Sequence, residues 1–205
     1  MRKDLGRLLL PGAVALWLAG AGPAVAQSYP RQFDESETWV HASSGMTFPA
    51  RVGPFRKFDR WQYDEAALDV SAGYGLEASG LDIVATVYVY PAPGGTGAEA
   101  ACREELERRK REVVEVNPSS QLVGQGPAPP PAGLRAAGAR AMFHQEASFH
   151  GRRRAVASEL YVFCSDEGRW DVEYRITYPR EADAAASVES FMRTLRWTLN
   201  AGSTP

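Results

Sequence analysis

The residue types best suited to chemistry gather in one short segment, where His144, Glu146, Ser148 and His150 occupy alternate positions. On a β-strand, the four side chains would point to one face. Imidazole and carboxylate groups are ligands for zinc or copper. The first and last of them would lie about 20 Å apart, too far to share one ion. Only His144 with Glu146, or His150 with a residue elsewhere, could chelate a metal; the alternative is the polar face of an amphipathic strand.

A second arrangement capable of chemistry would be a serine beside a histidine, and Ser43 and Ser44 follow His41 closely. We interpret this proximity as a coincidence of a Ser-rich loop. The hydrolase motifs G-x-S-x-G, S-x-x-K and H-E-x-x-H do not occur in the sequence. We therefore assign no catalytic residue and expect no cofactor.

The chain contains two cysteines, Cys102 and Cys164, which are too far apart to form a C-x-x-C redox motif. An even number of cysteines in an oxidising compartment favours a disulfide. Closing the loop between Cys102 and Cys164 with a disulfide would stabilise the fold by about 4 kcal/mol in the chain-entropy model. The alternative is two buried, unpaired thiols.

The first 26 residues have the pattern of a cleavable secretory signal peptide. Basic residues precede an apolar stretch at residues 8–18, and Ala24-Val25-Ala26 supplies the small residues that signal peptidase recognises, with Gln27 following. The apolar stretch is shorter than the roughly 20 residues of a membrane span. The alternative is an uncleaved N-terminal anchor. We expect no stable membrane span after cleavage.

The composition indicates the kind of organism that encodes the protein and excludes one class of partner. Only three of the 23 basic residues are lysine, a bias typical of a GC-rich bacterial genome. With the signal, this predicts a periplasmic or secreted protein. The signal removes three basic residues and one acidic residue, so the mature chain has 20 basic and 24 acidic residues and a net charge of −4. Such a protein has no global electrostatic attraction to nucleic acid or to anionic lipid, and we expect no nucleic-acid partner.

The patterns further along predict regular elements after a loose N-terminal segment at residues 27–45. Pro and Gly limit residues 46–58 to a short or edge strand, and the Pro-rich residues 123–138 are predicted to be an extended loop. Alternation and β-branched residues predict strands at 66–76, 83–90, 140–149, 155–164, 169–178 and, at the end, 195–197. Helices are predicted at 98–116 and 182–194.

Three of these elements have two contrasting faces. Apolar and aromatic residues alternate with charged ones along residues 169–178, so we expect one buried and one solvent-exposed face. The charged side of residues 98–116 is predicted to be a solvated helix face. Its apolar side carries Cys102, and Cys164 lies on the apolar face of a strand, so the two cysteines can meet between helix and sheet. Turns are predicted at Ser79-Gly80, at His150-Gly151 and at residues 165–168.

The element order is strands, a helix, a three-strand meander and a second helix, which predicts an α+β fold. We expect one domain over residues 46–199, built from an antiparallel sheet of about 5–7 strands packed with two main helices.

This order resembles the PsbP-like α/β sandwich group, which includes the photosystem PsbP protein and some exported bacterial proteins. The segments that carry the resemblance are GMTFP at residues 45–49 and SFMRTL at 190–195. The resemblance would cover most of the mature chain. It implies a binding or assembly role without a shared catalytic set, and it carries over no functional residue.

Two hypotheses on function follow. The first is an exported, non-enzymatic binding or accessory module of the bacterial envelope, whose partner is an envelope protein or ligand that the sequence does not identify. The second is a small metal-binding or hydrolytic periplasmic enzyme that uses His144, Glu146 or His150. The sequence leaves enzymatic activity undecided, and the lack of a catalytic motif favours the first hypothesis.

Overall fold

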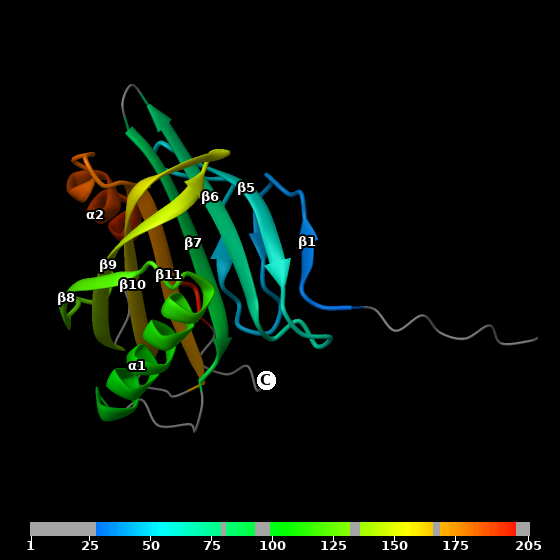
Figure 1. The fold of residues 1–205 in the computed structure, drawn as a ribbon. Helices are drawn as coiled ribbons and strands as arrows, with labels where there is room; N and C mark the ends of the chain where they lie inside the picture. The colour runs from blue at the N-terminus through cyan, green and yellow to red at the C-terminus, as the bar shows by residue number, and fades with distance from the viewer. Residues whose placement is uncertain (1–27, 79–80, 93–98, 132–135, 166–168, 200–205) are drawn as a thin grey trace, which may run out of the picture.

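The computed structural model describes residues 28–78, 81–92, 99–131, 136–165 and 169–199 (Figure 1). The predicted signal peptide at residues 1–26 lies outside the described residues. The predicted turn residues Ser79 and Gly80 and most of the turn at 165–168 lie outside them as well.

The described part is dominated by strands. The short strands near the N-terminus are β1 (Arg31–Phe33), β2 (Trp39–Val40), β3 (Thr47–Phe48) and β4 (Arg51–Val52). The longer strands are β5 (Phe55–Gln62), β6 (Val70–Ala78), β7 (Leu81–Pro91), β8 (Gln121–Pro127), β9 (Ala136–Phe149), β10 (Arg152–Ser165) and β11 (Trp170–Pro179). The helices are α1 (Glu99–Val116) and α2 (Ala185–Thr194).

One antiparallel sheet of nine strands forms the body of the fold. Eight of its strands follow the order β1-β5-β6-β7-β11-β10-β9-β8, and β4 pairs with β5. A separate two-stranded sheet joins β2 to β3. The β9–β10 hairpin closes through His150 and Gly151, whose φ angles of 48° and 73° belong to a tight hairpin turn. This turn confirms the prediction at that position.

The predicted fold class is wrong. Strands take up 51% of the chain's described part and helices 18%, so the protein is richer in β structure than a balanced α+β sandwich of about 5–7 strands. The predicted extended loop at 123–138 overlaps β8 and the start of β9, and residues 46–58 contribute β3, β4 and the first half of β5. β8 was missed because an edge strand with Pro and Gly shows little alternation; six of its seven residues are exposed. In residues 46–58 the Pro and Gly residues concealed the start of β5, which lies inside the sheet between β1 and β6 and alternates between buried and exposed positions. The predicted strand at 195–197 has no strand structure.

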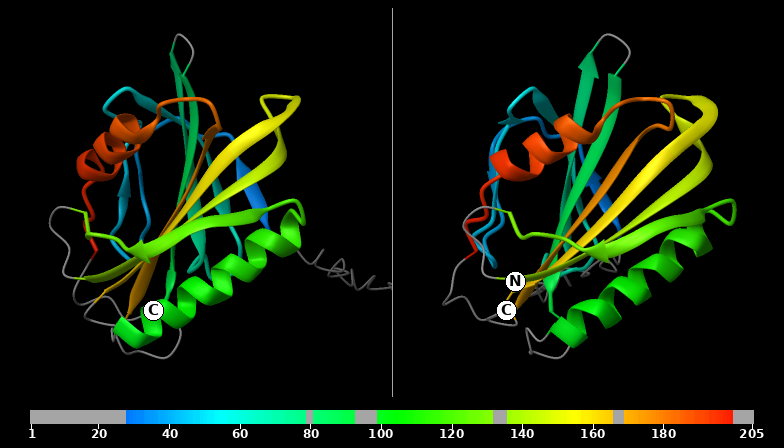
Figure 2. Two further views of the ribbon diagram at one scale, coloured as in Figure 1. Left: turned by 60° about the vertical axis from the view of Figure 1, so that its left-hand side comes forward. Right: turned by 90° about the vertical axis from the view of Figure 1, so that its left-hand side faces the viewer.

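The two helices cover opposite faces of the sheet (Figure 2). Cys102 and Leu106 of α1 pack on Phe143, Leu160 and their neighbours in β9 and β10. On the other face, Val188 and Phe191 of α2 join the larger core, whose fully buried side chains include Phe55, Tyr74, Tyr174 and Trp170. The strands between the helices are therefore buried on both faces.

Double-sided burial corrects the expectation for β11. Its charged face, which we expected to be solvent-exposed, is covered by α1, and Asp171 and Glu173 are 3% and 0% exposed. The charged side of α1 is correspondingly not a wholly solvated face, since Glu105 is 4% exposed. The predicted apolar side of α1 is buried at Cys102, whereas Val116 at the helix end is 81% exposed.

The N-terminal segment, which we expected to be loose, contributes β1 and β2 and a buried histidine. The His41 Nδ1 lies 2.7 Å from Ser44 Oγ, and its Nε2 lies 2.6 Å from the carbonyl oxygen of Ala67.

Neither described helix is long and apolar enough to cross a bilayer.

Candidate functional site

The polar residues at alternate positions of β9 do not converge. His144 is half-buried within the strand and opposite Ala157 of β10, and Glu146 is exposed. His150 lies beyond the strand, in the hairpin turn, and its ring packs against Phe149 at 4.5 Å between centroids. Across the described ranges, no three His, Cys, Asp or Glu side chains are grouped so as to hold a metal ion.

The serine and histidine of the N-terminal segment do come together. Ser44 donates its hydroxyl hydrogen to His41 Nδ1 when His41 donates from Nε2 to Ala67. Both side chains are almost completely buried, and burial lowers the pKa of His41. Ser44 also accepts a hydrogen bond from the backbone N–H of Met46. The pair therefore fixes the path of the chain into β3, with no room for a substrate at the serine.

The cysteines lie where the sequence placed them, between α1 and β10. The Cα atoms of Cys102 and Cys164 are 5.5 Å apart, a separation compatible with a disulfide bond. This pair would tie the first turns of α1 to the sheet.

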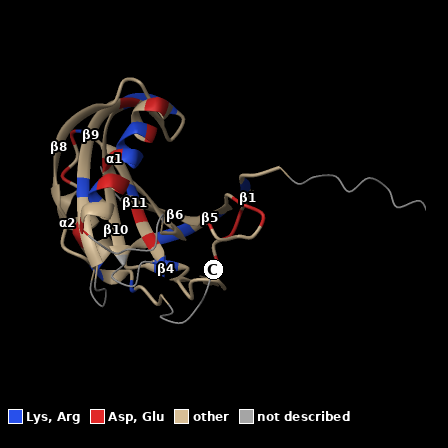
Figure 3. Ribbon diagram, turned by 90° about the horizontal axis from the view of Figure 1, so that it is seen from below, with Lys and Arg blue, Asp and Glu red and all other residues tan. Residues whose placement is uncertain are grey.

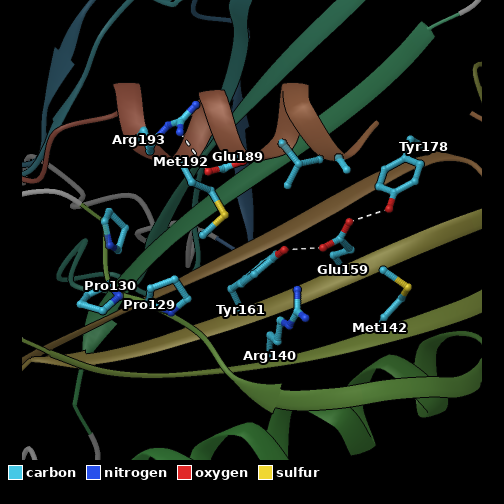
Figure 4. A pocket seen from close by; sticks show the side chains of 13 residues that line it. Pro129, Pro130, Arg140, Met142, Glu159, Tyr161, Tyr178, Glu189, Met192 and Arg193 are labelled. Carbon is cyan, nitrogen blue, oxygen red and sulfur yellow. Dashed lines mark hydrogen bonds and ion pairs between the residues drawn. The ribbon is translucent and has the colours of Figure 1, made fainter. Parts of the chain in front are cut away.

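A hollow with a mixed polar and apolar lining lies on the opposite side of the sheet, beneath α2 (Figure 4). Its volume is about 650 Å³. Three segments wall it: α2; the central parts of β9 and β10 together with the end of β11; and the Pro129–Pro131 run after β8. Ligand cavities in proteins usually measure about 300–1,000 Å³ and combine an apolar lining with a few polar groups.

The floor of this cavity carries a buried carboxylate between two tyrosines. Both Tyr161 and Tyr178 donate their hydroxyl hydrogens to Glu159, one to each carboxylate oxygen, and the Tyr178 bond is 2.5 Å long. All three side chains are less than 8% exposed. The register explains why they meet, because Glu159 and Tyr161 share one face of β10 while Tyr178 stands opposite Ala157 on β11.

The tyrosines are held in their neutral form. Burial raises the pKa of Tyr161 and of Tyr178, and the hydrogen bond to Glu159 raises each further. The guanidinium of Arg140, which lies opposite Tyr161 on β9, opposes the rise at Tyr161. The two hydroxyls therefore remain hydrogen-bond donors throughout the physiological pH range.

The wall formed by α2 follows from helical spacing. Five side chains at helical i, i+3 and i+4 spacing line the cavity, with Val188 at the base and Met192 over the floor. At the rim, Arg193 donates to Glu189 at 2.9 Å. The cavity-lining residues of α2 are Ala185, Val188, Glu189, Met192 and Arg193.

The third wall depends on a glycine. The backbone N–H of Ala128 donates to the carbonyl oxygen of Gly138 at 2.9 Å, which holds the Pro-rich run beside β9. A side chain at position 138 would collide with the Ala128 carbonyl oxygen and with the ring of Phe163. Glycine at this position therefore permits the close approach that brings Pro129–Pro131 over the sheet.

A second polar cluster lies under α1, on the other face. Glu173 pairs with Arg109 at 3.0 Å and with Arg175, and the hydroxyl of Tyr90 donates to Glu105 at 3.0 Å. Basic and acidic residues are interspersed along this helix (Figure 3). Because opposite charges of helix and sheet pair here, we interpret this cluster as the attachment of α1 to the sheet.

Sequence reasoning missed Glu159, Tyr161 and Arg140, and it interpreted Tyr178 as part of the buried aromatic face of its strand. The apolar face of the strand predicted at 155–164, which carries Cys164, gives no indication of the polar side chains on its other face. One signal was available: a single acidic residue at 159 stands within an otherwise largely apolar run, which is unusual for a strand that is buried on both sides.

Comparisons with protein-family models, with curated proteins and with solved structures found no match. The geometry of the cavity is therefore the basis for any conclusion on function.

Proposed function

We propose that this chain is an exported, non-enzymatic binding module of the bacterial envelope and that the cavity beneath α2 holds its ligand. One observation carries the proposal: apolar side chains from three segments and a buried, tyrosine-capped carboxylate converge on a space of about 650 Å³. An apolar enclosure with a few fixed polar groups is the usual form of a small-molecule site.

Features of the sequence and of the structure support the location outside the cytoplasm and the binding role. The signal-peptide pattern of residues 1–26 and the cysteine pair at disulfide distance both suit an oxidising compartment such as the periplasm. The resemblance to the PsbP-like group, whose members mostly bind or assemble, also favours binding over catalysis. In the cavity, Glu159 already accepts two hydrogen bonds, which suits an acceptor for a ligand better than a general base.

The test is a fluorescence titration with phenylnaphthylamine, a neutral apolar dye that brightens in apolar surroundings. We expect saturable binding to the purified mature protein. The substitution Ala185→Trp places an indole at the cavity wall and should weaken dye binding at least about tenfold, because a filled cavity cannot hold the dye.

Ala186→Trp is the matched control. Ala186 is the next residue of α2, is exposed like Ala185 and is not a cavity-lining residue. The control should bind the dye as the unchanged protein does. The absence of saturable binding, or an equal loss in both variants, would show that the cavity is not the ligand site.

A further inference from the structure

Within the described residues Glu159 forms no ion pair, although Arg140 lines the same cavity. Glu159 is 6% exposed, yet within the described ranges no Lys, Arg or His nitrogen lies within 4.0 Å of its oxygens. The other two buried glutamates, Glu105 and Glu173, are each paired with arginines. Buried carboxylates are normally paired with a cation, because removing a charge from water is costly.

The two tyrosine hydrogen bonds compensate only part of this cost. A carboxylate offers about four acceptor positions, and the tyrosines occupy one on each oxygen. Glu159 also lines the cavity, so its remaining acceptor capacity can be reached from the space beneath α2. A ligand that supplies a positive charge and hydrogen-bond donors would complete the site.

The surroundings of Glu159 suit an organic cation better than a metal ion. Tyr161 and Tyr178 place aromatic rings on the cavity lining, and ring faces attract ammonium groups. The side chains of Met142 and Met192, which are flexible and polarizable, stand beside them, and Pro129–Pro131 closes the far side (Figure 4). A metal ion would need several oxygen or nitrogen ligands, whereas the cavity lining is mainly apolar.

We propose that the cavity binds an amphipathic organic cation, with its ammonium group at Glu159 and its apolar part along Met192 and the Pro-rich run. This inference rests on the proposed function of the cavity as a ligand site.

Arg140 allows a second, independent test of whether the ligand carries a positive or a negative charge. It is exposed on β9 next to Tyr161 and forms no ion pair with another described residue. Its positive charge would repel a cation at Glu159 and attract an anion. Removing that charge should therefore strengthen the binding of a cationic ligand and weaken that of an anionic one.

The experiment compares three probes with the same apolar tail and different head groups. Dodecyltrimethylammonium, dodecanoate and dodecanol, each below the concentration at which it forms micelles, compete with phenylnaphthylamine for the full mature protein. We expect dodecyltrimethylammonium to displace the dye at the lowest concentration. Glu159→Gln should weaken the binding of dodecyltrimethylammonium at least about tenfold and leave the binding of dodecanol nearly unchanged. Arg140→Gln should strengthen the binding of dodecyltrimethylammonium by up to about fivefold.

The outcomes separate the two proposals. One outcome is dye binding that Ala185→Trp weakens, with dodecanoate or dodecanol competing as well as dodecyltrimethylammonium does. In that case the preference for a cation is overturned and the proposed function stands. If neither the dye nor any probe binds, the proposed function itself fails. Should Glu159→Gln not fold, the exposed Arg140→Gln decides alone, because weaker cation binding in that variant contradicts the proposal.

Discussion

At the scale of single residues, buried carboxylates lie on both faces of the sheet, and their neighbours give them different roles. Glu159 has two tyrosine hydroxyls and the cavity beside it. Glu173 is fully buried under α1 between Arg109 and Arg175. Asp171 is also buried under α1. Burial raises its pKa to about 7, with Glu105 adding to the rise and Arg109 and Arg108 opposing it.

Asp171 therefore makes stability depend on pH. Its pKa in the folded protein lies above its ordinary value of 3.8, so the folded state holds this proton more tightly than the unfolded state. The protonated residue favours folding at low pH, and this contribution is lost as pH rises from about 4 through about 7.

We expect Asp171→Asn, which stays neutral, to be more stable than the unchanged protein at pH 8 and to lose this advantage near pH 4. The difference in the free energy of unfolding should grow by up to about 4 kcal/mol across that range, from a shift of about three pKa units. Urea unfolding at several pH values measures it. Asp34→Asn, at an exposed position, is the control. A difference that does not change with pH would contradict the expected role of burial.

At the scale of elements, each helix is attached to the sheet by a different kind of contact. α2 is attached by apolar side chains, among them Phe191, whose ring lies 4.7 Å from that of Phe55. α1 buries few apolar residues and relies on the cysteine pair and on ion pairs to β11, from Arg109 to Glu173 and from Glu112 to Arg175. The guanidinium of Arg109 also lies over the ring of Tyr90, at 4.2 Å from its centroid.

We expect Arg109→Ala to lower the free energy of unfolding by about 3 kcal/mol, because it leaves buried glutamates with less compensation. Arg103→Ala is the matched control on the same helix. Its ion pair with Glu99 is exposed, and its loss should cost no more than about 0.5 kcal/mol. Denaturant unfolding of both variants measures the difference. Equal effects would mean that charges do not attach α1 to the sheet.

The elements also differ in how well sequence patterns predicted them. The range of α1 was predicted to within one residue at its start, because i,i+4 pairs of opposite charge reveal the helical period locally. β10 and β11 were found from alternation. β8 was missed because a strand exposed at the sheet edge has no alternation to display. The polar face of β11 was misjudged because nothing in a strand's own sequence states whether a helix will cover it.

At the scale of the whole molecule, compartment and redox state are linked. The signal-peptide pattern predicts export, and the Cys102–Cys164 pair encloses a sequence separation of 62 residues. This loop includes most of α1, β8 and β9, so a disulfide would restrict nearly a third of the chain in the unfolded state.

Protein recovered from the periplasm should show no free thiol when it is unfolded without reductant. Reduction should lower the free energy of unfolding by up to about 4 kcal/mol in the chain-entropy model for this loop. Thiol titration followed by unfolding with and without reductant measures both quantities. A Cys102→Ser, Cys164→Ser double variant should not respond to reductant. Two titratable thiols in the unreduced protein would reject the disulfide.

The sequence by itself determined features that depend on neighbours along the chain. These include the helical range of α1, the alternation in β10 and β11 and the His150-Gly151 turn. Short-range spacing fixes backbone period and turn geometry, so these features are visible in a linear pattern.

Only the tertiary structure decided which side chains share a cavity. Glu159 and Tyr178 are 19 residues apart and meet because β10 and β11 pair in one register. Met192 and Pro129–Pro131 reach the same space through the packing of α2 and the close approach at Gly138. His144 and Glu146 on β9 and His150 in the turn after it remain apart for the converse reason. Regular spacing along an extended strand separates side chains, and convergence requires separate elements to pack together.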